Sequence, residues 1–152
     1  MKKKTVFIVG AVVLLSSLAL SAASFVMMYK MNYEDDITKV VYHVSEPDRV
    51  QFALNNVKNH ILGVEDSTKL KVVFVVHGPA LKEFHSGNVK SEVSAIVREL
   101  EAHSVGFEAC MNTMNAQKIS TEELLSGFVR IDEGGVVRLA ELQKQGYAYI
   151  RP

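Results

Sequence analysis

The segment that most limits the fold is Leu70–Val76, in which Lys71 is the only polar residue. Its β-branched and aromatic side chains are typical of a strand. Apolar and polar side chains do not alternate along it, so both faces of the strand must be covered. That pattern is typical of a parallel sheet with helices on either side.

Four more segments have strand-like composition, and apolar stripes with helical spacing lie between the strands. The strands are expected at residues 39–44, 70–76, 105–110, 129–131 and 147–150. The helical stripes are expected within 50–61, 89–100, 124–128 and 136–140, the last with Val136, Leu139 and Ala140 pointing inward. Connections of this length require crossovers. We therefore predict a three-layer α/β/α domain with a mostly parallel sheet of about five strands.

Polar residues and glycines predict where the helices begin and end. Ser45 and Asn88 are candidate N-caps, and Ser120–Glu123 has the spacing of a capping box. Gly134–Gly135 is expected to open the last helix and Gly146 to close it. The segment after residue 110 is expected to be a polar turn.

The N-terminus has the pattern of an export segment. Lys2–Lys4 precede an apolar stretch, and Ser21–Ala23 provides a small-residue cleavage signal. The uncharged run continues from Thr5 to Met28, which is long enough for an uncleaved membrane anchor. Both alternatives place the domain outside the cytoplasm, in the periplasm or on the outer face of the cytoplasmic membrane.

These patterns divide the chain into an export segment or anchor at 1–28, a linker at 29–38 and a domain at 39–152. The whole chain has 17 basic and 17 acidic residues. Without Lys2–Lys4 the balance is mildly acidic, so no nucleic acid is expected as a partner.

Cys110 is the only cysteine, so it cannot form a disulfide within one chain. It follows a predicted strand and precedes Asn112, where backbone N–H groups of the next turn can stabilise a thiolate. The alternative is that Cys110 packs as a small buried hydrophobic residue. Both interpretations remain open at this stage.

Two further polar residues follow predicted strands, Ser45 after the first and His77 after the second. Ligands bind beyond the carboxyl ends of the strands in an open parallel sheet, so Cys110, His77, Asn112 and Ser45 form the predicted site. His77 can act as a base or hydrogen-bond partner for the thiol, or can simply satisfy backbone groups of its own turn. His43 lies inside a strand, where a satisfied core histidine is the simpler interpretation.

Sequence motifs for other chemistry are absent. Gly134–Gly135 matches neither phosphate-binding glycine motif, and no nucleophile elbow occurs. No histidine or cysteine pair has metal-ligand spacing, so no cofactor and no metal is predicted, although Cys110 with His77 or His43 is a minor copper or zinc alternative.

Four segments together resemble the exported branch of the DsrE/DsrF-like family: Val40–Val44, Val76–Leu81, Val105–Met114 and Gln145–Pro152. The resemblance implies a compact α/β/α domain that assembles into homo-oligomers. It also implies sulfur relay, because the best-known members carry sulfane sulfur as a persulfide on a strand-end cysteine. That role falls on Cys110, with His77 lining the same pocket.

Two functional hypotheses follow. The first is an envelope protein that binds or transfers sulfane sulfur on Cys110 and exchanges it with a donor or acceptor protein. The second is a non-enzymatic oligomeric or partner-binding module of the cell envelope, in which Cys110 is buried and structural. Whether the chain is an enzyme stays open.

Overall fold

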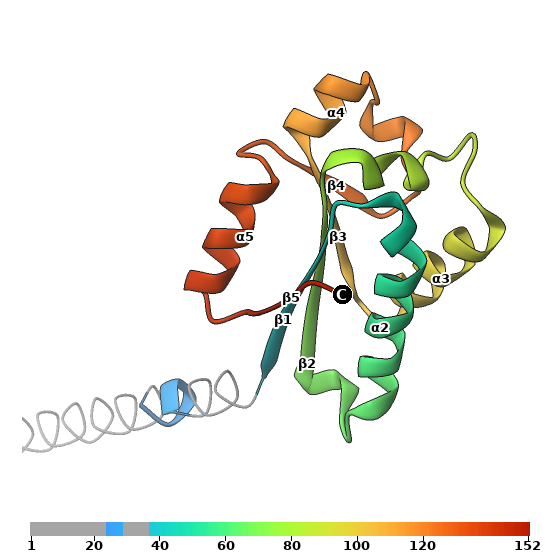
Figure 1. The fold of residues 1–152 in the computed structure, drawn as a ribbon. Coiled ribbons are helices and arrows are strands. Elements are labelled where there is room, and N and C mark those ends of the chain that lie inside the picture. The colour runs from blue at the N-terminus through green and yellow to red at the C-terminus, as the bar shows by residue number, and fades with distance from the viewer. Residues whose placement is uncertain (1–23, 29–36) are drawn as a thin grey trace, which may run out of the picture. The chain divides into compact units, whose positions relative to one another are not determined.

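The computed structural model describes residues 24–28 and 37–152, and a sheet of five parallel strands forms its centre (Figure 1). The strand order is β4-β3-β2-β1-β5. The strands are β1 Thr38–Val44, β2 Leu70–Val76, β3 Gly106–Cys110, β4 Phe128–Ile131 and β5 Ala148–Ile150. The predicted parallel sheet is confirmed, and every neighbouring pair of strands is parallel.

The strand order decides which face each helix covers. The chain steps from β1 to β4 in one direction and then returns across the sheet to β5. Since crossovers are right-handed, the forward steps place α2 (Val50–Gly63) and α3 (Ser91–Ala102) on one face. The return step places α5 (Gly135–Lys144) on the other face, as Figure 1 shows. The two faces therefore have unequal cover.

The hydrophobic core has two parts, one on each face of the sheet. The larger part lies under α2 and α3 and contains four phenylalanines whose ring centroids are 5.0–6.2 Å apart in contacting pairs: Phe74, Phe84, Phe107 and Phe128. The smaller part lies under α5: Val41, Val73, Val75, Ile131, Leu139, Leu142 and Tyr147. Alternation along the strands assigns neighbouring residues to opposite parts.

The predicted stripe of α2 is confirmed, because Val50, Ala53, Leu54, Val57 and Ile61 are all buried. The predicted stripe of α5 is partly wrong. Leu139 is buried, but Val136 is 71% exposed and Ala140 is also exposed. The helix instead turns Gly135 and Leu142 inward.

Two of the predicted caps are wrong. Ser45 caps no helix: a 3-10 turn at Pro47–Arg49 leads into α2, and Ser45 accepts a hydrogen bond from Arg151. Asn88 lies in a turn before α3, which begins at Ser91 without a side-chain cap.

The capping box at Ser120–Glu123 is present, but it opens a 3-10 helix at Thr121–Glu123 rather than the predicted helix at 124–128. The chain becomes extended there because Phe128 enters β4.

An unpredicted helix, α4 (Met111–Gln117), follows Cys110 where a polar turn was expected. Its asparagines and threonine are weak helix formers, so propensity did not signal it. Tertiary packing provides the stabilisation, because Met114 is buried in the larger core.

The predicted export segment and linker fall mainly on residues 1–23 and 29–36, which lie outside the described residues. Residues 24–28 are helical. Within the described part of the chain, no helix has both the length and the apolar character that a membrane crossing requires.

Candidate functional site

Three predicted site residues meet where the strands end. His77 directly follows β2, and Cys110 is the last residue of β3. The register pairs Val76 with Ala109, so the next step brings His77 beside Cys110 on strands about 4.8 Å apart. His77 lies on the same face of the sheet as Val75, two residues before it, and Cys110 lies on the same face as its strand partner Ile131. Val75 and Ile131 belong to the smaller core, so both site side chains lie on the α5 face.

The Cys110 thiol is buried, with 6% of the residue exposed. Burial raises the pKa of the thiol, but hydrogen bonds to the sulfur have the opposite effect. The donors are the backbone N–H of Gly135, the N–H and hydroxyl of Thr113, and the N–H of Asn112. Together they hold the pKa of Cys110 below its ordinary value, so this environment favours a thiolate.

Gly135 makes this arrangement sterically possible. A Cβ atom at this position would lie 3.3 Å from the Cβ of both Cys110 and His77, and 3.4 Å from His77 Cδ2. The absent side chain lets the first turn of α5 approach the thiol closely enough for its N–H to donate. Gly134 has a φ of 90°, a conformation that favours glycine, and a Cβ atom there would lie only 2.8 Å from Asn112 Nδ2.

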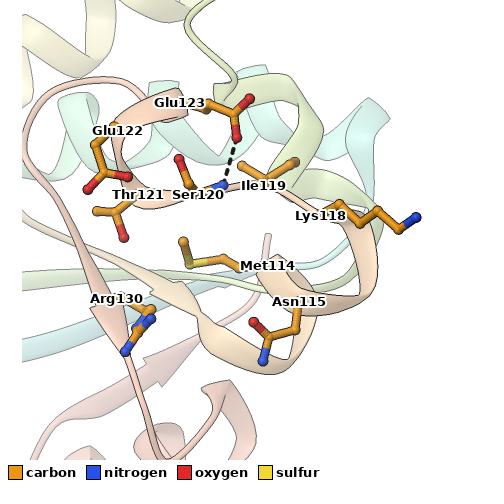
Figure 2. Close-up of a pocket in the computed structure, with 9 residues that line it drawn as sticks. All are labelled: Met114, Asn115, Lys118, Ile119, Ser120, Thr121, Glu122, Glu123 and Arg130. Carbon is orange, nitrogen blue, oxygen red and sulfur yellow. Dashed lines mark hydrogen bonds between the residues drawn. The ribbon is translucent and has the colours of Figure 1, made fainter.

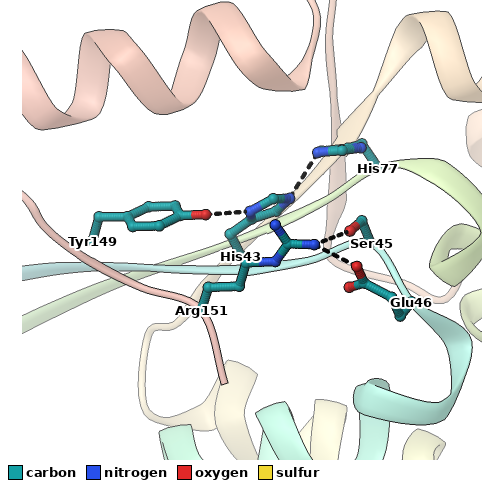
Figure 3. A network of polar contacts seen from close by, with 6 residues as sticks. All are labelled: His43, Ser45, Glu46, His77, Tyr149 and Arg151. Carbon is teal, nitrogen blue, oxygen red and sulfur yellow. Dashed lines mark hydrogen bonds and ion pairs between the residues drawn. The ribbon is translucent and has the colours of Figure 1, made fainter.

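A chain of hydrogen bonds runs from His77 to the protein surface (Figure 3). His77 Nε2 lies 2.7 Å from His43 Nε2, and His43 Nδ1 lies 2.7 Å from the Tyr149 hydroxyl. His43 is only 5% exposed, whereas Tyr149 is 41% exposed. The chain therefore connects the buried strand ends with solvent.

Both imidazoles are held neutral. Burial, followed by the charges of His77 and Arg151, lowers the pKa of His43 to about 4. Burial and then Arg151 also lower the pKa of His77, and Glu46 partly opposes this. At neutral pH each ring therefore carries a single proton.

Arg151 is fixed beside the two histidines by residues at the end of β1. Its guanidinium donates to the Ser45 hydroxyl at 3.1 Å and forms an ion pair with Glu46. Figure 3 shows the three side chains next to His43. This brings the C-terminal residues to the carboxyl edge of the sheet.

The turn after His77 is pinned to α4. Thr113 accepts a hydrogen bond from the Gly78 N–H at 2.9 Å, and Gln117 donates to the Gly78 carbonyl at 2.8 Å. Thr113 therefore contacts both the thiol and the turn that positions His77. These bonds couple the positions of Cys110 and His77.

A family comparison agrees with this fold. The family model for the DsrE/DsrF-like family matches residues 18–152. The chain belongs to the DsrE/DsrF-like family. This family is linked to sulfur transfer.

Two solved structures resemble this DsrE/DsrF-like protein. One is a protein of unknown function from Methanobacterium thermoautotrophicum, MTH1491, which is 30% identical to this chain with a TM-score of 0.66. The match covers 76% of this chain and 99% of the MTH1491 chain. The other is the ychN protein from E. coli, which is 17% identical with a TM-score of 0.64. The match covers 76% of this chain and 100% of the ychN chain. The second likeness concerns the fold alone. A search of curated proteins found no match.

The structure of this DsrE/DsrF-like protein brings together Cys110, His77 and Asn112. Ser45 lies at the same edge but contacts Arg151 and the Gly78 turn. His43 is the buried, satisfied histidine that its strand position predicts, because both of its ring nitrogens are hydrogen-bonded.

Several residues of the site were not predicted: Thr113, Gly135, Tyr149, Arg151 and Glu46. Strand alternation could have indicated Tyr149. In the pairing of β5 with β1, Tyr149 lies opposite Val41, which points to the same face as His43. Gly135 gave no such signal, because its role depends on where α5 docks.

The described residues contain no group of three or more histidine, cysteine or acidic side chains arranged to hold a metal ion. His43 Nε2 and His77 Nε2 are hydrogen-bonded to each other.

A separate pocket of about 480 Å³ lies on the other side of α4 (Figure 2). Met114, Lys118 and Arg130 line it together with the Ser120–Glu123 turn. None of the predicted site residues lines this pocket, so its size carries no argument about the chemistry of Cys110.

Proposed function

We propose that this protein carries sulfane sulfur on Cys110 as a persulfide, in the cell envelope. The observation that supports the proposal best is the set of backbone N–H groups around the Cys110 sulfur. Donors in this arrangement stabilise an anionic sulfur, which is the form that both attacks a sulfur donor and persists as a persulfide. Family membership adds support.

The proposed loading step is a thiol exchange. The Cys110 thiolate attacks the outer sulfur of a persulfide donor, R–S–SH. A Cys110 sulfur–sulfur bond forms, the donor's sulfur–sulfur bond breaks, and the electron pair leaves on R–S⁻, which then takes up a proton. An acceptor thiol reverses these steps and removes the sulfur.

The test is intact-mass measurement after incubation with polysulfide or thiosulfate. Wild type is expected to gain the mass of one sulfur atom, which dithiothreitol removes. Cys110→Ser should gain none. Absence of the added mass on wild type, or equal addition on Cys110→Ser, would refute the proposal.

The envelope location rests on Lys2–Lys4 and the uncharged run 5–28. We expect the domain to be digested by protease in intact spheroplasts and to resist in whole cells. A domain that is digested only after lysis of the inner membrane would place it in the cytoplasm and contradict the exported assignment.

Homo-oligomer formation is part of the proposal. Val129 on the edge strand β4 and Val136 and Val137 in α5 are 63%, 71% and 49% exposed, and burying exposed apolar surface favours association. Light scattering after gel filtration should give a mass above one chain. A monomer at all concentrations would refute this part.

The burial of Cys110 favours a second candidate, the non-enzymatic module with a structural cysteine. The two candidates differ in the alkylation of the native thiol. The sulfur carrier should react with iodoacetamide while folded, at a rate that increases with pH. A thiol that reacts only in denaturant would support the module.

A further inference from the structure

The hydrogen-bond chain Tyr149–His43–His77 lies on the α5 face of the sheet, beside the apolar residues of the smaller core. His43 is buried among valines of β1 and β2, in positions where the other inward residues are apolar. Buried imidazoles need partners, and here the partners are arranged in one line with a solvent-exposed end.

Neutral imidazoles allow two proton arrangements along this line. In the first, Tyr149 donates to His43 Nδ1, His43 Nε2–H donates to His77 Nε2, and His77 carries its proton on Nδ1. In the second, every bond is reversed: His77 Nε2–H donates to His43, His43 Nδ1–H donates to Tyr149, and His77 Nδ1 is bare. The same heavy-atom distances fit both arrangements.

We infer that Tyr149, His43 and His77 form a proton relay to the site of sulfur transfer at Cys110. The relay gives a proton to the leaving group of the sulfur donor and later takes a proton from the acceptor thiol. This inference rests on the proposed function. His77 would be the catalytic residue, since it follows β2 beside Cys110 and the Cβ atoms of both residues lie 3.3 Å from where a Cβ of Gly135 would be. His43 and Tyr149 would be positioning residues that act through His77.

The proton balance closes over the two half-reactions. During loading, His77 Nδ1–H protonates R–S⁻, His77 regains a proton from His43, His43 regains one from Tyr149, and Tyr149 takes one from solvent. During unloading, an acceptor R′–SH gives its proton to His77 Nδ1 and the chain shifts back, releasing one proton from Tyr149. The net reaction is R–S–SH plus R′–SH to R–SH plus R′–S–SH.

The surroundings fit a relay of neutral groups. Burial, and after it the charge of Arg151 beside both imidazoles, disfavours a second proton on either ring. The Cys110 thiolate is stabilised by backbone N–H groups instead, so it does not need the relay for its own ionisation. Loss of the relay should therefore slow protonation of the leaving group R–S⁻ and leave the ionisation of the Cys110 thiol unchanged.

The decisive experiment compares two persulfide donors, one with a basic alkyl thiolate as leaving group and one with a weakly basic nitroaryl thiolate. Loading rates of Cys110 are followed by mass spectrometry for wild type and Tyr149→Phe. Removing the hydroxyl should lower the ratio of alkyl to nitroaryl loading rates by about 10²-fold, the low end of what a positioned acid contributes. An unchanged ratio would overturn the relay.

Tyr42→Phe is the matched control. Tyr42 also donates or accepts a hydrogen bond with a histidine, His60, at 3.0 Å, but on the opposite face of β1. This variant should keep the wild-type ratio of rates. His43→Gln provides a second test of the relay and should reproduce the loss seen for Tyr149→Phe.

Failure of the relay and failure of the proposed function give different results. If wild type is loaded by neither donor, sulfur transfer itself is wrong. If it is loaded by both donors and Tyr149→Phe and His43→Gln leave the ratio unchanged, sulfur transfer stands and the relay is wrong. A solvent deuterium isotope effect on alkyl persulfide loading that is lost in Tyr149→Phe would add support.

Discussion

The same strands present different side chains to the two faces of the sheet. Toward α2 and α3 they present apolar and aromatic groups: Val40, Tyr42, Val44, Val72, Phe74, Val76 and Phe107. Toward α5 the valines give way to polar groups near the carboxyl ends: His43, His77, Glu108 and Cys110. The α5 side holds the smaller core.

The two faces differ because more of the chain packs on one face of the sheet than on the other. Helices α2 and α3 and the 3-10 helix at Gly78–Phe84 exclude water from the first face, where an unpaired polar group would cost several kcal/mol. The single helix α5 leaves room at the strand ends for polar groups that pair with one another or with backbone N–H groups. The face under α2 and α3 thus contributes most of the stabilising core, and the face under α5 contains the candidate functional site.

The largest expected effect is on stability at the first face. Phe74→Ala should lower the free energy of unfolding by about 4 kcal/mol, because Phe74 is fully buried and contacts two other rings. Leu139→Ala on α5 should cost about 2 kcal/mol, since the thinner cover can relax into the space. Urea unfolding of both variants measures the contrast, and equal losses would show that the two cores are equivalent.

Acid should weaken the second face selectively. The pKa of His43 is lowered to about 4, below its ordinary value of 6.5, so the folded state favours the neutral ring. Its stabilising contribution is complete above pH 6.5 and is lost as the pH falls toward 4. After allowance for solvent screening we expect a loss of about 2 kcal/mol.

The measurement is urea unfolding of wild type and His43→Gln from pH 7 to 4. The difference between the two proteins should shrink as the pH falls. A difference that stays constant over this range would contradict the assignment of the loss to His43.

Gly135→Ala tests the close approach of α5 to the site. The new methyl group would press on Cys110 and His77, each 3.3 Å away, and displace the N–H from the sulfur. We expect iodoacetamide to react about tenfold more slowly with Cys110 at pH 7, because losing the Gly135 N–H raises the pKa of the thiol and leaves less of the reactive thiolate.

Gly63→Ala is the control for this change. Gly63 ends α2, and nothing lies within 4 Å of the added Cβ. Its Cys110 alkylation rate should equal that of wild type. A Gly135→Ala rate equal to that of wild type would remove the Gly135 N–H from the explanation of the thiol pKa.

The smallest expected effect compares two ion pairs. Arg138 of α5 donates two hydrogen bonds to Glu108 of β3, at 2.7 and 2.8 Å, in a partly buried position. Glu108→Gln should cost about 1 kcal/mol, whereas Glu99→Gln, which breaks an exposed pair with Lys58, should cost about 0.3 kcal/mol. Thermal unfolding checks both, and equal costs would show that Arg138 does not anchor α5.

Much of the fold could be predicted because its signals are local. The apolar run Leu70–Val76 indicates a doubly covered strand, and the spacing of apolar residues in 50–61 indicates α2. The misses, α4 and the inward face of α5, both concern segments whose conformation depends on what they pack against. Met114 and Gly135 are buried by contacts with parts of the chain far from them in sequence.

The site divides in the same way. The amino-acid order alone places Cys110 and His77 at strand ends, because strand boundaries follow from local composition and parallel strands end at one edge. It does not indicate that Gly135 donates to the thiol, or that Tyr149 and Arg151 reach His43 and Ser45 from the last residues of the chain. Those contacts exist because the return crossover brings α5 and β5 back over β1, and the pairing of distant segments depends on the whole set of packed layers.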